Sequence, residues 1–245
     1  MRIARLETSH GPSHAVADAT GWRHIADPFA DELVFTGGST AFDDAVLLAP
    51  VDPRVLLGIA QNKGNNDHVL PIQAWYKSPH TVTGQNATIE IVRGVGQVNI
   101  EGELAVVIGR HASKLTPENA LDAVLGYTIA NDVTNVDQVP IDEKNFQSKS
   151  GPSYTPLGPW IETEIADPES VPTEVAINDV VLAESGSFNL GSTVVETLVY
   201  VTSWLDLEAG DVVMTGAPRT FLPVEPGDRV DIRLEGVGTL SSTIV

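Results

Sequence analysis

The chain has 245 residues, 42% of them hydrophobic, so it can bury the core of one large domain or of a large and a small one. Its 33 acidic and 14 basic residues give a net charge of −19, which argues against nucleic-acid binding because it repels phosphate backbones. The absence of cysteine excludes disulfides, thiolate metal sites and a cysteine nucleophile. No apolar run reaches the roughly 18 residues of a membrane helix. Residues 1–7 turn polar too early for a signal peptide, so we expect a soluble, cytoplasmic protein.

The character of the sequence changes near residue 50. Residues 1–50 read as short strands with polar turns, whereas longer apolar segments follow, beginning with residues 55–60. We therefore expect a small N-terminal β-rich domain over residues 1–50 and a main domain over residues 51–245.

The main domain is expected to consist mostly of strands. Residues 98–100 lead into an apolar run over 104–109, which is typical of a buried strand. Gly-Asp turns at 210–211 and 227–228 are each followed by β-branched residues that favour strands. Strands over 230–234 and 239–245 flank a hairpin connection at 235–238.

Only two helices are predicted. Thr116 would cap the first, with Pro117 at its first position and an end near Val124. Thr193 and Glu196 form a capping-box pattern before an apolar stripe that runs to residue 205. Few helices among many strands indicate a β-rich α+β fold.

Three acidic residues form a candidate metal site. Side chains alternate along a strand, so Glu101 and Glu103 point the same way while Gly102 leaves the other face open. Two neighbouring carboxylates repel each other, and a bound cation removes that repulsion. Asp132 ends an apolar segment over 126–131, where a strand would deliver a carboxylate to the rim of the sheet.

The same trio has a simpler interpretation. Glu101 and Glu103 can lie on a solvated strand face while Asp132 caps a turn, since Glu-x-Glu pairs are common. If the trio does bind metal, carboxylates without His or Cys suit Mg²⁺, Mn²⁺ or Ca²⁺ better than Zn²⁺.

The residues around the trio resemble the fumarylacetoacetate hydrolase family. The similar stretches span 97–137, 149–160 and 207–240, in the same order as in the family. They include Glu-Gly-Glu-Leu-Ala-Val-Val-Ile-Gly at 101–109, Gly-Tyr-Thr-Ile-Ala-Asn-Asp-Val at 126–133 and Gly-Asp-Val-Val-Met-Thr-Gly at 210–216. The resemblance implies a β-rich, usually dimeric enzyme with one divalent cation, Mg²⁺ being expected, held by Glu101, Glu103 and Asp132.

The resemblance also implies functional residues and a chemistry. Lys149 matches the family's active-site lysine, Lys77 matches a second lysine motif, and Thr215 matches a threonine near the substrate. Each has a plainer alternative: a surface lysine, a strand-edge charge and a turn residue, respectively. Family members act on 2-oxo and β-diketo acids by C–C hydrolysis, decarboxylation or isomerisation, all of which require a stabilised enolate.

The chain departs from the family pattern where water is activated. Hydrolytic relatives carry a His followed three residues later by Glu, a general-base pair. Here His68 matches only with an insertion, and Pro71 follows it at that spacing. His68 is thus a candidate catalytic residue or an exposed loop histidine.

Further departures lie around the expected substrate. Val136 replaces an Arg, and Val139 replaces a Gln for which Gln138 is a candidate substitute. Pro152 and Ala217 replace an Asp and a second Thr.

These residues lead to one expectation and one rival. We expect an enzyme acting on a 2-oxo dicarboxylate or similar enolisable acid from the catabolism of aromatic compounds. Isomerisation or decarboxylation tolerates the missing His-x-x-Glu better than hydrolysis does. The rival is a catalytically silent relative that binds metal and a small carboxylate. Signatures of serine hydrolases, P-loops and dinucleotide binding are missing.

Overall fold

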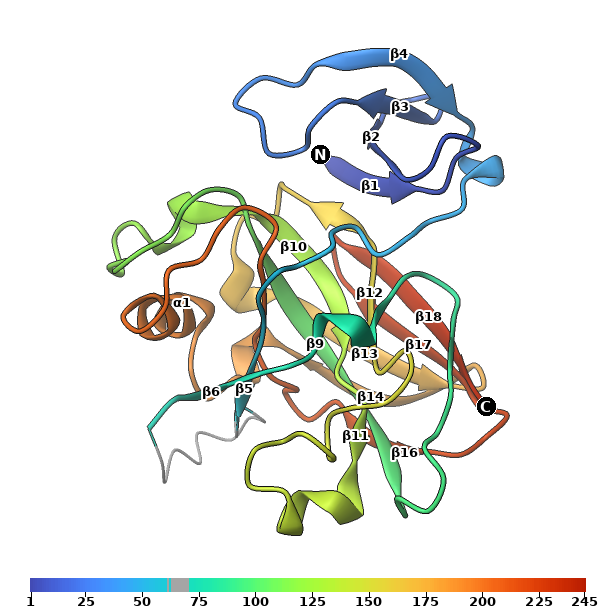
Figure 1. Ribbon diagram of the computed structural model, residues 1–245, viewed down its shortest axis with the longest axis vertical. Helices are drawn as coiled ribbons and strands as arrows, with labels where there is room; N and C mark the ends of the chain where they lie inside the picture. The colour runs from blue at the N-terminus through green and yellow to red at the C-terminus, as the bar shows by residue number, and fades with distance from the viewer. Residues whose placement is uncertain (61, 63–70) are drawn as a thin grey trace.

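The chain folds mainly into strands, which form two sheets, and the described residues include one α-helix (Figure 1). The computed structural model describes residues 1–60, 62 and 71–245. The sheets mix parallel and antiparallel pairs, which confirms the predicted β-rich α+β class. No helix in these residues is long and apolar enough to cross a bilayer.

The larger sheet has 13 strands and includes the N-terminal lobe. Its strands are β1 (Arg2–Leu6), β2 (Ser13–Ala17), β3 (Trp22–Ile25), β4 (Phe35–Thr40), β5 (Leu56–Ala60), β6 (Gln73–Tyr76), β7 (Val82–Thr83), β9 (Val98–Ile108), β10 (Val124–Asn131), β11 (Thr134–Asn135), β12 (Thr155–Glu162), β15 (Val212–Met214) and β16 (Phe221–Val224). Figure 1 shows β1 to β4 as a lobe at one end of the molecule. The lobe has its own small apolar cluster, around Leu6 and Trp22. Strand β1 pairs with β12 of the main body, so a boundary at residue 50 stays a prediction.

The smaller sheet has five strands and packs against β9 of the larger one. Its strands are β8 (Ala87–Ile89), β13 (Pro172–Ile177), β14 (Val180–Gly186), β17 (Arg229–Leu234) and β18 (Gly238–Ile244). The hairpin of β17 and β18 confirms the turn predicted at 235–238.

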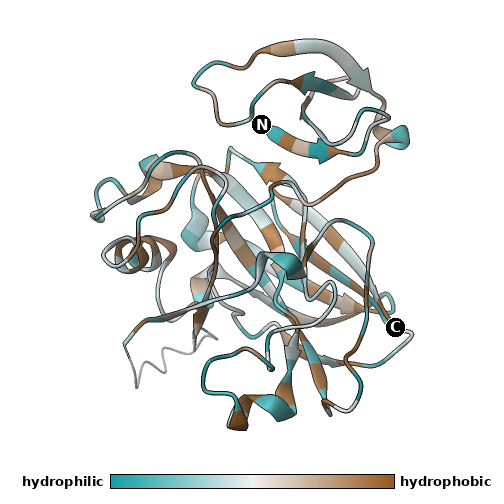
Figure 2. Ribbon diagram, viewed as in Figure 1, coloured by the Kyte–Doolittle hydropathy of each residue, from teal (hydrophilic) through white to brown (hydrophobic). Residues whose placement is uncertain are grey.

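Strand β9 is the centre of the core. All of its 11 residues are buried, and Figure 2 shows apolar residues along it and its neighbours. A Cβ at Gly102 would lie 3.0 Å from methyl groups of Val175 and Ile232 on the smaller sheet. Glycine therefore lets the two sheets approach closely behind the acidic pair Glu101 and Glu103.

The second predicted helix is confirmed as α1 (Val194–Thr202). Thr193 and Glu196 form the capping box, in which each side chain accepts a hydrogen bond from the other residue's backbone N–H. The helix buries Leu198 and Val201 and ends before residue 205.

The helix predicted from Thr116 to Val124 is wrong. Only a short 3₁₀ turn, η3 (Ala120–Ala123), forms there. The Asn119 side chain accepts a hydrogen bond from the Thr116 N–H and closes a turn instead of a helix. Strand β10 then begins at Val124, where pairing with β9 overrides the local helix signal. The other 3₁₀ turns are η1 (Phe42–Asp44), η2 (Pro79–Thr81), η4 (Val136–Ile141), η5 (Pro168–Ser170) and η6 (Ser187–Asn189).

Candidate metal centre

Two neighbouring strands bring the three predicted carboxylates together. Glu101 and Glu103 lie in the middle of β9, and Asp132 follows the last residue of β10. The backbone N–H of Asp132 donates to the Glu101 carbonyl at 2.9 Å, which holds the two residues side by side. One carboxylate oxygen from each of the three lies within 4.8 Å of the others, and each residue is only 3% exposed. No other set of three acidic or histidine side chains in the described part of the chain converges in this way.

Two lysines bind the carboxylate cluster, one at each carboxylate oxygen of Asp132. Lys149 Nζ donates to Glu101 Oε1 at 2.9 Å and to Asp132 Oδ2 at 2.5 Å. Lys77, directly after β6, donates to Asp132 Oδ1 and to the Tyr154 carbonyl, the latter at 2.9 Å. Both lysines are buried, so neither is the surface charge of the plainer interpretation.

Burial and mutual charge give the clustered groups different pKa values. Burial, reinforced by Asp132 and Glu101, raises the pKa of Glu103 well above its ordinary value. Burial also disfavours ionised Asp132, but Lys149 and Lys77 outweigh it and lower the Asp132 pKa. Burial lowers the pKa of Lys77, and nearby Lys149 adds to that effect. For Lys149, burial is outweighed by Asp132 and Glu101, which raise its pKa.

Hydrogen bonds fix the orientation of the two glutamates. The Thr134 hydroxyl donates to Glu101 Oε1 at 2.7 Å. The Gly216 backbone N–H donates to Glu103 Oε2 at 2.7 Å. Asn62 supports this contact because its amide donates to the Thr215 carbonyl at 2.6 Å, one residue before Gly216. The carboxylates are therefore held in fixed positions by backbone and side-chain donors.

The donor set fits a hard divalent cation. Carboxylate oxygens are the ligands that Mg²⁺, Mn²⁺ and Ca²⁺ prefer. Three buried carboxylates meet two ammonium groups, so the cluster carries one uncompensated negative charge when all five groups are ionised. A cation at the point where Glu101, Glu103 and Asp132 converge would supply the missing positive charge.

A cavity of about 260 Å³ opens beside this cluster. Its lining residues are Ile59, Ala60, Gln73, Trp75, Glu101, Asp132, Thr134, Val139, Asp142, Glu143, Asn145, Lys149 and Phe221. Lys149 Nζ lies 5.4 Å from the centre of the Trp75 ring, which packs over Gly58 of the neighbouring strand. Buried polar groups and an apolar wall thus meet in one space of small-molecule size.

The remaining predicted site residues occupy different places. Thr215 is buried and directly precedes Gly216, whose N–H binds Glu103. The Thr215 hydroxyl donates to the Leu104 carbonyl at 2.8 Å. Gln138 donates to the Val95 carbonyl at 3.2 Å and does not line the cavity. His68 lies outside the described residues. Substrate contact by Lys77, Thr215 or Gln138 stays a prediction, as does catalysis by His68.

The sequence interpretation overlooked three cavity residues. Thr134 stands two positions after Asp132, a spacing that could have indicated a shared site. Trp75 stands two positions before Lys77 in the same way. Asp142 carries no such signal, because a turn held by hydrogen bonds from the Ser148 backbone and hydroxyl brings it to the cavity.

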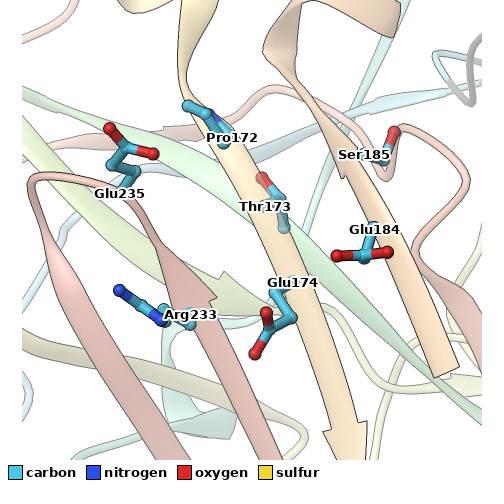
Figure 3. A pocket seen from close by; sticks show the side chains of 7 residues that line it. All are labelled: Pro172, Thr173, Glu174, Glu184, Ser185, Arg233 and Glu235. Carbon is cyan, nitrogen blue, oxygen red and sulfur yellow. The ribbon is translucent and has the colours of Figure 1, made fainter. Parts of the chain in front are cut away.

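A second acidic hollow, of about 250 Å³, lies on the smaller sheet (Figure 3). Glu174 on β13 stands opposite Glu184 on β14 and Arg233 on β17, and Glu235 follows β17. Unlike the first cluster, its charged side chains are half-buried or exposed.

Comparison with known proteins supports the fold, and two family models match separate parts of the chain. Residues 53–245 match the family described as fumarylacetoacetate (FAA) hydrolase C-terminal, and residues 1–50 match an Rv2993c-like N-terminal family. Protein Rv2993c of Mycobacterium tuberculosis is 31% identical over 262 residues, covering 100% of this chain and 98% of its own.

Two further relatives have names that describe a reaction. Oxaloacetate tautomerase YisK of Bacillus subtilis is 34% identical over 69% of this chain and 59% of its own length. A crystal structure described as 5-carboxymethyl-2-hydroxymuconate delta-isomerase from Mycobacterium smegmatis has a TM-score of 0.94 and 32% identity. That likeness covers 100% of this chain and 99% of the other.

Proposed function

Because the chain belongs to the fumarylacetoacetate hydrolase family and is an enzyme of it, we propose that it isomerises a 2-oxo or β-diketo acid with the help of a divalent cation. The observation that supports this most directly is the convergence of Glu101, Glu103 and Asp132, with Lys149, at the buried end of a cavity. Enolisation moves a proton from the carbon beside a carbonyl and leaves negative charge on the oxygen. A site that concentrates positive charge on one oxygen accelerates that step.

The residues of the carboxylate cluster have different roles in the proposed reaction. A cation held by Glu101, Glu103 and Asp132 would act as a Lewis acid for the 2-oxo group. Lys149, at the cavity surface, remains an ammonium and donates a hydrogen bond to the developing enolate oxygen or to the substrate carboxylate. Lys77 lies deeper and holds Asp132 in its ionised form. Thr134 keeps Glu101 turned toward the same point.

Isomerisation is proposed before hydrolysis for a chemical reason. Hydrolysis requires a base that positions water, and Pro71 stands where such relatives have the glutamate of the pair. Keto–enol exchange needs only proton transfer and enolate stabilisation. The two relatives named for a tautomerase and an isomerase fit that choice. Decarboxylation of a β-oxo acid passes through the same enolate and is the next candidate, followed by C–C hydrolysis.

The proposal extends to the ion, the assembly and the setting. Mg²⁺ is proposed as the working ion, with Mn²⁺ or Ca²⁺ as substitutes, because all three take carboxylate ligands.

A homodimer is proposed because Tyr76 and Trp204, 66% and 81% exposed, line an apolar groove that a second copy would cover. A cytoplasmic enzyme of aromatic catabolism would meet such acids, and fractionation of the source cells would test that location.

Turnover measurements test the proposal. Ketonisation of enol oxaloacetate and acetylpyruvate would be followed by ultraviolet absorbance after chelator treatment and again after adding Mg²⁺ or Mn²⁺. We expect rates that depend on the ion and that fall strongly in Lys149→Met, whereas the surface variant Glu184→Gln keeps the full rate. Metal-loaded protein that converts neither acid would instead support a catalytically silent relative that only binds metal and a carboxylate.

A further inference from the structure

One buried asparagine holds the loop that carries Lys149. Asn135, the second residue of β11, is 1% exposed. Its side-chain amide donates to the Gln147 carbonyl at 2.7 Å and to the Ser150 carbonyl at 3.4 Å. Its backbone N–H donates to the Ser148 carbonyl at 2.7 Å. Because these carbonyls come before and after Lys149 in the chain, a single residue fixes the backbone on both sides of that lysine.

The orientation of the Asn135 amide follows from its partners. Both loop carbonyls can only accept hydrogen bonds, so the amide nitrogen must face them. The amide oxygen accepts a hydrogen bond from the Tyr154 hydroxyl at 2.8 Å, and that hydroxyl accepts one from the Val92 N–H at 3.3 Å. Tyr154 is fully buried, and its ring lies so close to Gly151 that a Cβ there would be 2.4 Å from it. The Asn135 side chain is thus held in one orientation.

Two donors to one carboxylate oxygen depend on β11. The Thr134 hydroxyl donates to Glu101 Oε1 at 2.7 Å, and Lys149 Nζ donates to the same atom at 2.9 Å. The first donor belongs to β11 itself, whereas the second belongs to the loop that Asn135 holds. A lysine ammonium group ends a long, flexible stem, so it reaches a defined point only if its backbone is fixed. A shift of the loop would move it relative to both Glu101 and Asp132.

We propose that Asn135 is a positioning residue, which holds the loop so that the Lys149 ammonium group stays against Glu101 and Asp132 and faces the developing enolate oxygen. It acts through Lys149, since it is buried and is not among the residues that line the cavity. Displacing a reacting group by about 1 Å can lower a rate a hundredfold. The effect on rate rests on the proposed function, whereas the placement of the ammonium group can be tested without turnover.

A double-mutant cycle on the metal-free protein tests the placement through stability. Asn135→Leu keeps a side chain of similar size and removes the amide, and Lys149→Met removes the ammonium group. If Asn135 acts through Lys149, the double variant loses clearly less Tm than the two single losses added together. The control is Thr202→Val, which removes a buried hydroxyl that donates to the Leu198 carbonyl, and its loss should add fully to that of Lys149→Met. Full additivity for Asn135→Leu would overturn the proposal.

The rate of the Mn²⁺-loaded protein is the second measurement. For ketonisation of enol oxaloacetate, Asn135→Leu should lower kcat at least about tenfold and raise KM by a smaller factor, because the misplaced group acts on the enolate. Thr202→Val should keep the wild-type kcat. Once Lys149 is Met, Asn135→Leu should cause no further fall. Tyr154→Phe removes only the hydroxyl that donates to Asn135, and should show smaller effects of the same kind.

Different results would overturn the positioning role and the proposed function. If the wild-type protein converts neither enol oxaloacetate nor acetylpyruvate, the proposed function fails, and the stability cycle alone decides whether Asn135 places Lys149. If the wild-type protein is active but Asn135→Leu keeps its kcat, or loses the same factor with and without Lys149, the positioning role is wrong and the proposed function stands. Should Asn135→Leu fail to fold, Tyr154→Phe takes its place in both measurements.

Discussion

Two hollows of nearly equal volume, about 260 and 250 Å³, both carry several carboxylates, yet only one resembles a reaction site. At the candidate metal centre, carboxylates from β9 and the end of β10 converge on one point deep in the protein. On the smaller sheet, Glu174, Glu184 and Arg233 occupy neighbouring strands and extend from its surface (Figure 3). Water already solvates these surface charges, so they require no partner.

The difference shows that the number of acidic residues around a hollow does not by itself identify a reaction site. A buried charge without a partner destabilises the folded protein. At the first hollow, the buried carboxylates have four partners: Lys77, Lys149, the Thr134 hydroxyl and the Gly216 N–H. Among the described residues, the charged side chains of the second hollow have no comparable set of hydrogen-bond or ion-pair partners. A site capable of chemistry is thus marked by charges that the fold holds together against their mutual repulsion.

The largest expected effect comes from removing a buried ammonium group. Lys149→Met leaves Glu101 and Asp132 without their shared partner, and should lower the free energy of unfolding by about 3–5 kcal/mol. The matched change Arg233→Met, at the exposed hollow, should alter it by less than about 0.5 kcal/mol. Urea unfolding of the metal-free proteins measures both, and equal losses would contradict the contrast between the two hollows.

The next effect is on metal affinity. Glu103→Gln removes one of three charged ligands, and Mn²⁺ affinity should fall by at least about a hundredfold, or roughly 2.7 kcal/mol. Glu184→Gln removes a carboxylate from the surface hollow and should leave the affinity unchanged. Titration calorimetry with chelator-treated protein is the measurement. Unchanged binding in Glu103→Gln would show that the trio is not the metal site.

The smallest effect is a dependence of stability on pH. The pKa of Glu103 is raised in the folded state, so the folded protein binds that proton more tightly than the unfolded chain. Its contribution to stability is present at low pH and disappears as the pH rises through the folded pKa. Asp132, with a lowered pKa, contributes in the opposite sense, but only near and below its ordinary range around pH 4.

Thermal unfolding of metal-free protein between pH 5.5 and 8 tests that sign. Relative to Glu103→Gln, the wild-type protein should gain a few degrees of Tm on acidification, at about 2–4 °C per kcal/mol for a chain of this size. Glu184→Gln should keep the wild-type slope. The comparison with Glu103→Gln isolates one group, because other titrating side chains are common to both proteins. If Tm of Glu103→Gln depends on pH as strongly as Tm of the wild-type protein, Glu103 is not the group responsible.

Local patterns predicted the elements whose signals agree with their surroundings. The apolar run over residues 104–109, with residues 98–100 before it, indicated a buried strand, and β9 covers most of this segment. The capping box at Thr193 and Glu196 predicted α1. The weaker pattern after Thr116 failed because Asn119 closes a turn and β10 begins immediately afterwards. Where local preference and strand pairing conflict, pairing decides the structure.

The sequence by itself determined the family, the β-rich class and the side-chain chemistry of the centre, because strand alternation places Glu101 and Glu103 on one face and ordered motifs surround them. Tertiary structure alone decided which groups meet them. Lys77 and Lys149 lie 55 and 17 residues from Asp132 in the chain, yet both bind its carboxylate. It also placed Trp75, Val139 and Asp142 around one cavity. These contacts depend on how distant segments pack, which no local spacing encodes.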